Sequence, residues 1–294
     1  MKSKIIIGTR GSELALRQAE IVRHAIEKYQ PNVAIEIKII KTEGDSNQNP
    51  IPLYTVGKGW FTKEIEKELL AQTIDLAAHS LKDLPEVLPP GLCISAYLDR
   101  EDSRDVLVSK ENKTLGELAK GAIVGTDSIR RKVQILALRD DLVVESIRGN
   151  VLTRIEKLDA GMYDAVVLAY AGIKRLGIED RINQYFSSNE VMPAPGQGIL
   201  VIETREGDTT LNTLMQEIGN SEATYAAIAE RSFSHALGGG CKMPVGACAK
   251  LKGDTLILEG MFADESGTLR YDTIEGQVSE AKELGIRLAQ KIRT

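Results

Sequence analysis

The stretch GAIVGTDSIRRKVQILALRDD, residues 121–141, passes from a short apolar run through a polar turn into a helix-like pattern. The opening of the chain, KIIIGTRGSELAL at residues 4–16, follows the same plan, and both segments place Gly-Thr at the end of the apolar run. Ser12 is a plausible N-cap for the first helix, whose apolar residues recur at helical spacing as far as Tyr29. Two such segments far apart in one chain predict two α/β domains of similar plan.

Strand and helix patterns alternate through most of the chain. Further segments of this kind are VAIEIKII (33–40), TIDLAAHSLKDLP (73–85), LVVESIRGNVLTRIEKLDAG (142–161) and YDAVVLAYAGIKRLG (163–177). Gly161 is a candidate for the residue just beyond the end of a helix, where glycine is favoured. This alternation is typical of mostly parallel α/β sheets.

The pattern changes after Asn220. A helix is expected first, and it is followed by three strand-like stretches with hairpin-like turns, PVGACAKL (244–251), DTLILEGMF (254–262) and TLRYDTIEG (268–276). A last helix is expected over residues 279–291. These elements predict a small α+β domain with an antiparallel sheet. Its first loop, SHALGGGCKMPVGA (234–247), presents Cys241 after three glycines.

Composition and charge narrow the class of protein. The chain has 294 residues, which predicts two or three domains, and its 37 Lys+Arg against 42 Asp+Glu give a net charge of −5. This balance argues against nucleic acid or an anionic membrane as the main partner. We find neither a signal peptide nor a run as long as a membrane span, and the three cysteines lack metal-ligand spacing. We therefore expect a reduced, cytoplasmic protein without a metal site. We also expect a monomer that acts on a small-molecule substrate.

Arginines gather in the predicted strand-to-helix turns. They are Arg10, Arg130, Arg131, Arg148, Arg154 and Arg175. A cation at a helix N-terminus opposes the helix dipole, at a cost of about 0.3–1 kcal/mol each. Since ligands of parallel α/β sheets bind at this edge, we expect a cradle for a ligand with several anionic groups. The sequence lacks the spacing of a phosphate-binding loop, so the anionic groups of the ligand can be carboxylates as well as phosphates. The alternative is that each arginine lies at a helix end, is exposed to solvent and binds no ligand.

Other candidate residues lie in the same predicted turns and in one long loop. Asp83 follows a predicted strand, where its carboxylate can hold an N–H group, stabilise a cation or transfer a proton. The alternative is a turn aspartate before Pro85. His79 is expected to be packed rather than to act as a base. Lys58 and Phe61, in the stretch GKGWF (57–61) where glycines flank the lysine, are candidates for a lid, and a plain loop is the alternative.

Nine motifs, taken in order, resemble those of the hydroxymethylbilane synthase (porphobilinogen deaminase) family. They are TRGSELALRQA, GKGWFTKEIE, DLAAHSLKDLP, EDSRDVLVS, VGTDSIRRKVQ, SIRGNVLTRIEKL, YDAVVLAYAGIKRLG, PAPGQG and GGGCKMPVGA. The resemblance implies an enzyme that condenses four porphobilinogen molecules, with loss of ammonia, into linear hydroxymethylbilane. It also implies two periplasmic-binding-protein-like α/β domains and a C-terminal domain, with boundaries that we place at 1–98 plus 199–217, 99–198 and 218–294.

The resemblance further implies roles for individual residues. Cys241 would carry a dipyrromethane cofactor through a thioether, and Asp83 would contact pyrrole nitrogens and stabilise the cation formed on deamination. The positions that match cofactor-binding residues are Ser80, Lys82, Asp83, Thr126, Ser128, Arg130, Arg131 and Arg148. Those that match residues for the substrate or growing chain are Arg10, Ser12, Gln18, Arg148, Asn150, Arg154, Arg175 and Gln197.

The sequence departs from the family pattern at three positions. Asp127 stands where many members have a small hydroxyl residue, and it would repel carboxylates unless it points away or caps the helix. Thr55 and Glu43 stand near positions where basic residues are frequent. A non-catalytic, two-lobed carboxylate-binding protein is the alternative function, although such a protein has no use for Cys241.

Overall fold

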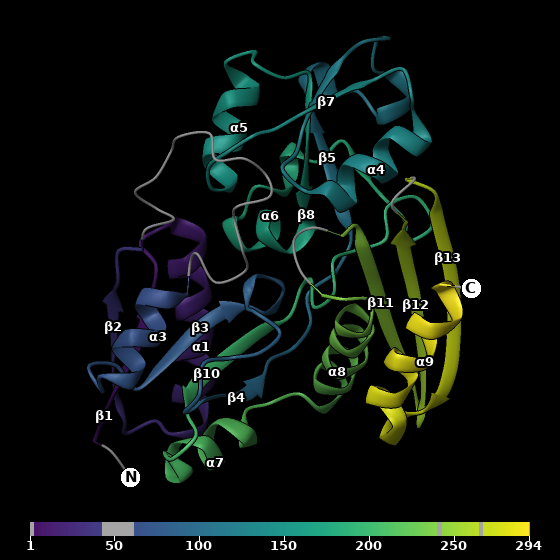
Figure 1. The fold of residues 1–294 in the computed structure, drawn as a ribbon. Coiled ribbons are helices and arrows are strands. Elements are labelled where there is room, and N and C mark those ends of the chain that lie inside the picture. The colour runs from purple at the N-terminus through teal and green to yellow at the C-terminus, as the bar shows by residue number, and fades with distance from the viewer. Residues whose placement is uncertain (1–2, 43–61, 240–242, 265–266, 294) are drawn as a thin grey trace. The chain divides into compact units, whose positions relative to one another are not determined.

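The computed structural model describes residues 3–42, 62–239, 243–264 and 267–293 (Figure 1). The chain divides into two compact units. The first comprises Met1–Asn49, Gly57–Glu101 and Ile199–Tyr225, and the second comprises Pro50–Val56, Asp102–Gly198 and Ala226–Thr294. The second unit thus contains two sheets, and the division of the chain into three domains at the boundaries given above stays a prediction.

The first unit contains a sheet with the strand order β2-β1-β3-β10-β4. Its strands are β1 (Lys4–Thr9), β2 (Ala34–Ile39), β3 (Leu76–Ser80), β4 (Leu92–Tyr97) and β10 (Leu200–Arg205). Its helices are α1 (Glu13–Tyr29), α3 (Lys63–Leu70) and α7 (Thr209–Glu217), and the 3-10 helix η1 (Leu81–Asp83) follows β3. Strand β1 runs parallel to β2 and β3, whereas β10 runs antiparallel to β3 and β4. The sheet is therefore mixed, because the chain returns to it in the opposite direction after residue 198.

Helix α1 shows why the opening segment folds as expected. Ser12 is its N-cap, and the Ser12 hydroxyl accepts a hydrogen bond from the backbone N–H of Ala15. Ala15, Ala19, Val22 and Ile26 form its buried face. This helical spacing places one apolar stripe against the sheet. The predicted N-cap and the predicted end at Tyr29 are both confirmed.

The second unit contains a sheet with the strand order β7-β6-β8-β5-β9. Its strands are β5 (Asp105–Ser109), β6 (Ile123–Gly125), β7 (Val143–Glu145), β8 (Ala165–Ala169) and β9 (Gln184–Tyr185). Its helices are α4 (Ile129–Leu138), α5 (Val151–Asp159) and α6 (Tyr170–Leu176). Strand β6 is parallel to β7 and β8, whereas β5 is antiparallel to β8 and β9. The two predicted α/β sheets are confirmed, and both are mixed.

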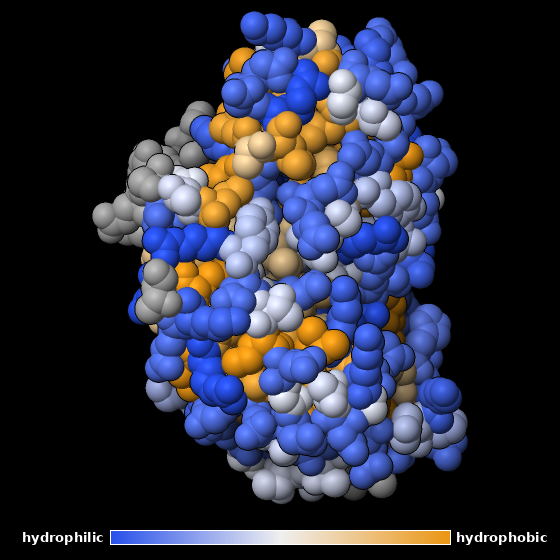
Figure 2. Space-filling view, turned by 90° about the vertical axis from the view of Figure 1, so that its right-hand side faces the viewer, coloured by the Kyte–Doolittle hydropathy of each residue, from blue (hydrophilic) through white to orange (hydrophobic). Residues whose placement is uncertain are grey.

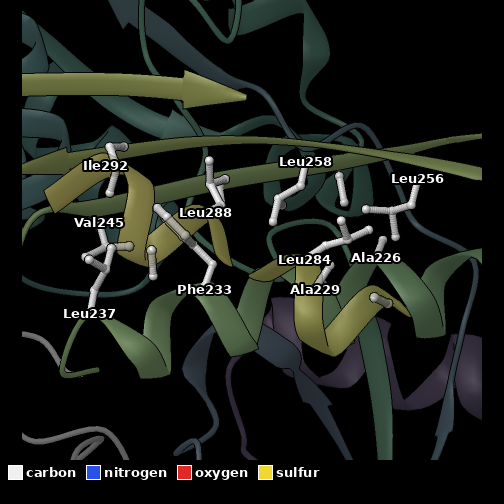
Figure 3. Close-up of a cluster of buried hydrophobic side chains, with 14 of the residues drawn as sticks. Ala226, Ala229, Phe233, Leu237, Val245, Leu256, Leu258, Leu284, Leu288 and Ile292 are labelled. Carbon is white, nitrogen blue, oxygen red and sulfur yellow. The ribbon is translucent and has the colours of Figure 1, made fainter. Parts of the chain in front are cut away.

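The C-terminal part of the second unit is a layer of helices on an antiparallel sheet, as predicted. The sheet joins β11 (Val245–Lys252), β12 (Thr255–Ala263) and β13 (Leu269–Gln277), and it is covered by α8 (Ser221–Ala236) and α9 (Ala281–Arg293). Figure 3 shows Phe233, Leu258 and Leu288 among the buried side chains of the core between the sheet and the two helices. At Gly285 an added Cβ would lie 2.4 Å from the Ala229 carbonyl oxygen, so only glycine lets α9 approach α8 so closely.

The described cysteines and His79 lie in strands. Cys93 is half-buried in β4 and Cys248 is buried in β11. His79 is buried in β3, where its Nε2 lies 3.0 Å from the carboxylate of the buried Glu203. His79 is therefore packed, as expected.

The outer surface is largely polar on the face that Figure 2 shows. Hydrophilic residues cover most of it, and hydrophobic residues form separate patches. Among the described helices, none has the length and apolar character that crossing a membrane requires.

Candidate active site

In the first unit, six predicted site residues lie at one edge of the sheet. They are Arg10, Ser12, Gln18, Ser80, Lys82 and Asp83. Strands β1 and β3 are parallel neighbours, so their carboxyl ends meet at this edge. Gln18 of α1 donates a hydrogen bond of 2.9 Å from Nε2 to the Ser80 hydroxyl, which ties α1 to the end of β3.

Helix η1 presents Lys82 and Asp83. Leu81 and Leu84 on either side of them are fully buried, and the backbone N–H of Leu81 donates to the Ile199 carbonyl oxygen at 3.0 Å. These contacts anchor the short helix, whereas the Asp83 side chain is exposed. Asp83 is therefore an accessible carboxylate on a fixed backbone, which is what an electrostatic catalyst needs.

In the second unit, the turn after β6 carries Thr126 and Ser128. The backbone N–H of Thr126 donates to the Glu145 carbonyl oxygen at 2.9 Å, which joins the ends of β6 and β7. Ser128 is the N-cap of α4, and its hydroxyl accepts a hydrogen bond of 3.3 Å from the backbone N–H of Arg131. This cap places Arg130 and Arg131 in the first turn of α4, as the sequence predicts.

Arg130 and Arg131 lie around a buried carboxylate that the sequence reading missed. Asp105, the first residue of β5, is fully buried, with Arg130 Nη1 2.7 Å from its Oδ2 and Arg131 Nη2 2.7 Å from its Oδ1. Gln197 donates to the same Oδ1 at 2.9 Å, and its side chain is buried. The sequence feature that could have indicated this buried carboxylate is an aspartate directly before the apolar run Val106–Val108, in a chain that also carries two adjacent arginines.

The Asp105 cluster has an electrostatic consequence. Burial alone would raise the pKa of Asp105, but the charges of Arg130 and Arg131 outweigh burial and hold the pKa well below its usual range. Burial lowers the pKa of Arg130, and the Asp105 charge opposes this effect. With two guanidinium groups and one carboxylate, the cluster keeps one net positive charge.

We expect Asp105→Asn to lower the free energy of unfolding by about 3–5 kcal/mol, because it leaves two buried guanidinium groups without their counter-ion. The depressed pKa also means that ionised Asp105 stabilises the fold above its unfolded pKa of about 4 and loses this contribution as the pH falls toward the folded value. Urea titrations at neutral and acidic pH measure both effects. Asp102→Asn, which removes a partly exposed partner of Arg104, is the control. Equal stability of the two variants would contradict the assignment.

The turn after β7 carries Arg148, and helix α5 that follows it carries Arg154. Asn150 caps α5, since its Oδ1 accepts from the backbone N–H of Thr153 at 3.0 Å. Gly149 has a φ of +114°, and a Cβ there would lie 2.5 Å from the Thr153 side chain. Arg154 donates from Nε to the Gly149 carbonyl oxygen at 2.9 Å. This bond holds the Arg154 side chain against the turn that carries Arg148.

Asp127 takes neither of the two arrangements in which we expect it not to repel carboxylates. Ser128 rather than Asp127 caps α4, and Asp127 does not point away from the arginines. Its Oδ2 lies 3.9 Å from Arg148 Nε and 4.0 Å from Arg154 Nη2. The structure thus brings Asp127 together with two residues that match substrate-binding positions.

Arg175 and Gln197 contact backbone groups of the second unit. Arg175, at the end of α6, donates from Nη2 to the Gly198 carbonyl oxygen at 2.7 Å. Gln197 donates to the Ser103 carbonyl oxygen at 2.7 Å in addition to Asp105. Their predicted substrate contacts stay predictions.

Several predictions lie outside the described residues. These are the lid residues Lys58 and Phe61, the cofactor attachment at Cys241, and the departures at Glu43 and Thr55. Within the described ranges, no group of His, Cys, Asp and Glu side chains has the arrangement of a metal site.

The sequence matches two family models. One is described as porphobilinogen deaminase, dipyrromethane cofactor binding domain, and matches residues 5–213. The other is described as porphobilinogen deaminase, C-terminal domain, and matches residues 224–294. A porphobilinogen deaminase of Syntrophomonas wolfei is 46% identical over 97% of this chain and 94% of that protein. One of Thermus thermophilus is 46% identical over 98% of this chain and 95% of that protein.

The alignments with solved structures are weaker. The periplasmic VFT2 domain of Bordetella pertussis BvgS aligns with a TM-score of 0.45 and 13% identity over 76% of this chain and 92% of that one. An ancestral arginine-binding protein bound to arginine aligns with a TM-score of 0.40 and 18% identity over 74% of this chain and 91% of that one.

Proposed function

Since the chain belongs to the porphobilinogen deaminase family, we propose roles in that reaction for the residues gathered at the two sheet edges. The protein is a porphobilinogen deaminase that forms hydroxymethylbilane in tetrapyrrole biosynthesis and uses a dipyrromethane cofactor. The alternative of a non-catalytic carboxylate-binding protein is therefore dropped.

The charge of the second unit fits ligands that carry several carboxylates. The cluster of Arg130, Arg131 and Asp105 has one net positive charge, and so has the cluster of Arg148, Arg154 and Asp127. Guanidinium groups pair with carboxylates through two parallel hydrogen bonds. This repeated excess of positive charge is the observation that carries the proposal. Dipyrromethane and porphobilinogen both bear acetate and propionate groups that such clusters can neutralise.

We assign the cofactor to a thioether at Cys241, held by Lys82, Thr126, Ser128, Arg130 and Arg131. When bound, the dipyrromethane supplies the pyrrole end to which the first porphobilinogen is joined. The two other cysteines support this choice, because they lie within strands. Cys248 Sγ is 3.6 Å from the Ser103 hydroxyl, and Cys93 Sγ is 3.5 Å from the Thr204 hydroxyl.

Asp83 is proposed to act at the reacting pyrrole. Its exposed carboxylate can accept a hydrogen bond from the pyrrole N–H of porphobilinogen. Loss of ammonia leaves a cation on that ring, and a fixed carboxylate stabilises this charge without having to reorient. The residues proposed to bind the substrate carboxylates during this step are Arg10, Ser12, Gln18, Arg148 and Arg154.

We expect Arg148→Ala to stall elongation more than cofactor attachment. Loss of a charge-assisted hydrogen bond of about 1.5–3 kcal/mol should slow turnover by about 10-fold to 100-fold. Mass spectrometry of the variant after mixing with porphobilinogen should show cofactor-bearing chain with incomplete adducts. Arg181→Ala, at the exposed ion pair with Asp159, is the control and should behave as the wild type. A complete product at wild-type rate from Arg148→Ala would refute the substrate role.

A cytoplasmic monomer remains our proposal for the form in which the enzyme acts. The support for a cytoplasmic location is the free thiol of Cys93, since free thiols are usual in a reducing compartment.

A further inference from the structure

We propose that Asp127 is an internal counter-anion of Arg148 and Arg154, which competes with substrate carboxylates and so sets the affinity of this enzyme for porphobilinogen. The inference rests on the proposed substrate role of the two arginines. It adds a residue that determines affinity without touching the reacting atoms.

The geometry is that of a loose ion pair. Asp127 Oδ2 lies 3.9 Å from Arg148 Nε and 4.0 Å from Arg154 Nη2. These separations exceed the 2.7–3.2 Å or so of a direct hydrogen bond, so the attraction is mainly electrostatic. The three side chains keep only 22–26% of their surface exposed, and the attraction is therefore screened less than on an open surface. Asp127 therefore attracts these nitrogens without making a direct hydrogen bond to them.

The other face of the Asp127 carboxylate is held in place. Ser146, just after β7, donates a hydrogen bond from its hydroxyl to Asp127 Oδ1. Tyr163 in turn donates from its hydroxyl to the Ser146 carbonyl oxygen at 2.7 Å. Burial raises the pKa of Tyr163, and the charges of Glu145 and Asp127 add to this effect, so the phenol stays protonated and remains a donor. These bonds keep Asp127 beside the arginines.

The arginines are held from their own side by the turn after β7. Arg154 Nε is bonded to the Gly149 carbonyl oxygen, which directs the remaining edge of the guanidinium group toward Asp127. Lys157 Nζ donates to the Arg148 carbonyl oxygen at 2.9 Å and fixes the backbone there. Asp127 therefore places one negative charge beside this pair of arginines, which lowers the positive charge that a substrate carboxylate meets there.

The experiment compares the steady-state kinetics of holoenzyme for Asp127→Asn and Asp127→Ser with those of the wild type. Asparagine retains the acceptor for Ser146, whereas serine shortens the side chain, so the two variants share only the loss of charge. Removing two partly buried ion pairs should lower the KM for porphobilinogen by about 3-fold to 10-fold. The effect should shrink as salt is added. Intact mass verifies equal cofactor loading.

Asp159→Asn is the matched control, since Asp159 is a carboxylate on α5 that pairs with Arg181. Its KM should equal that of the wild type. In an Arg148→Ala, Arg154→Ala background, the Asp127→Asn effect should disappear, because no guanidinium group remains for Asp127 to neutralise.

The outcomes separate this inference from the proposed function. If Arg148→Ala raises the KM but both Asp127 variants keep the wild-type KM or raise it, the counter-anion role is overturned and the substrate role stands. If neither Arg148→Ala nor the Asp127 variants change the KM, the substrate role of the arginines fails and the inference fails with it.

Discussion

Replacement of Asp83 by asparagine is expected to lower kcat by about 100-fold to 10,000-fold while the fold survives. Asparagine keeps the size of the side chain but carries no charge to stabilise the cation left when ammonia departs. Asp83 is exposed between two buried leucines, so the substitution removes no packing. Stopped-time assays of porphobilinogen consumption measure the loss, and circular dichroism checks the fold.

The matched control for this prediction is Asp99→Asn. Asp99 lies in the same unit, and its carboxylate accepts a hydrogen bond of 2.6 Å from the Asn220 side chain. It should retain wild-type turnover. A kcat for Asp83→Asn within a factor of about two of the wild type would remove Asp83 from the chemistry, because general acid–base and charge effects are far larger than this.

Replacement of Cys241 by serine is expected to abolish turnover. Covalent attachment at a cysteine uses the thiolate as the nucleophile. A serine hydroxyl is not ionised near neutral pH and cannot replace it. Without an attached cofactor, the first porphobilinogen has no anchored chain to join. The assay is the formation of hydroxymethylbilane after prolonged incubation with substrate.

Cys93→Ser serves as the control for the thiol substitution, because Cys93 lies within β4 in the described structure. It should remain active and should carry the cofactor. Sustained turnover by Cys241→Ser, or its loss in Cys93→Ser with the fold intact, would show that the cofactor is attached elsewhere.

Much of the fold follows from local sequence signals. Ser12 and the apolar spacing of α1 act within a few residues, so the cap and the end of that helix are readable from the chain. The three C-terminal strands are joined by short turns, which makes them antiparallel neighbours. The direction of β10 was not predicted, because alternation of apolar residues marks a strand without fixing which way it runs or which strands flank it.

Only part of the candidate site could be predicted from the sequence. The strand-to-helix turns that carry Arg130 and Arg148 follow from the repeated sequence plan. The groups that these arginines contact do not follow from that plan, because they are distant in the sequence. Asp105 is 25 residues away from Arg130, and Asp127 is 21 residues away from Arg148. Such pairs depend on how strands are ordered in the sheet. A charge that looks available in the sequence can therefore already be neutralised in the fold.

The most direct test of the account is the intact mass of the wild-type chain, combined with peptide mapping, before and after brief exposure to porphobilinogen. The account predicts a resting mass that exceeds the sequence mass by two pyrrole units, located on the peptide that contains Cys241, and further species that each add one pyrrole unit. An active preparation with the unmodified mass, or with the adduct on Cys93 or Cys248, would contradict it.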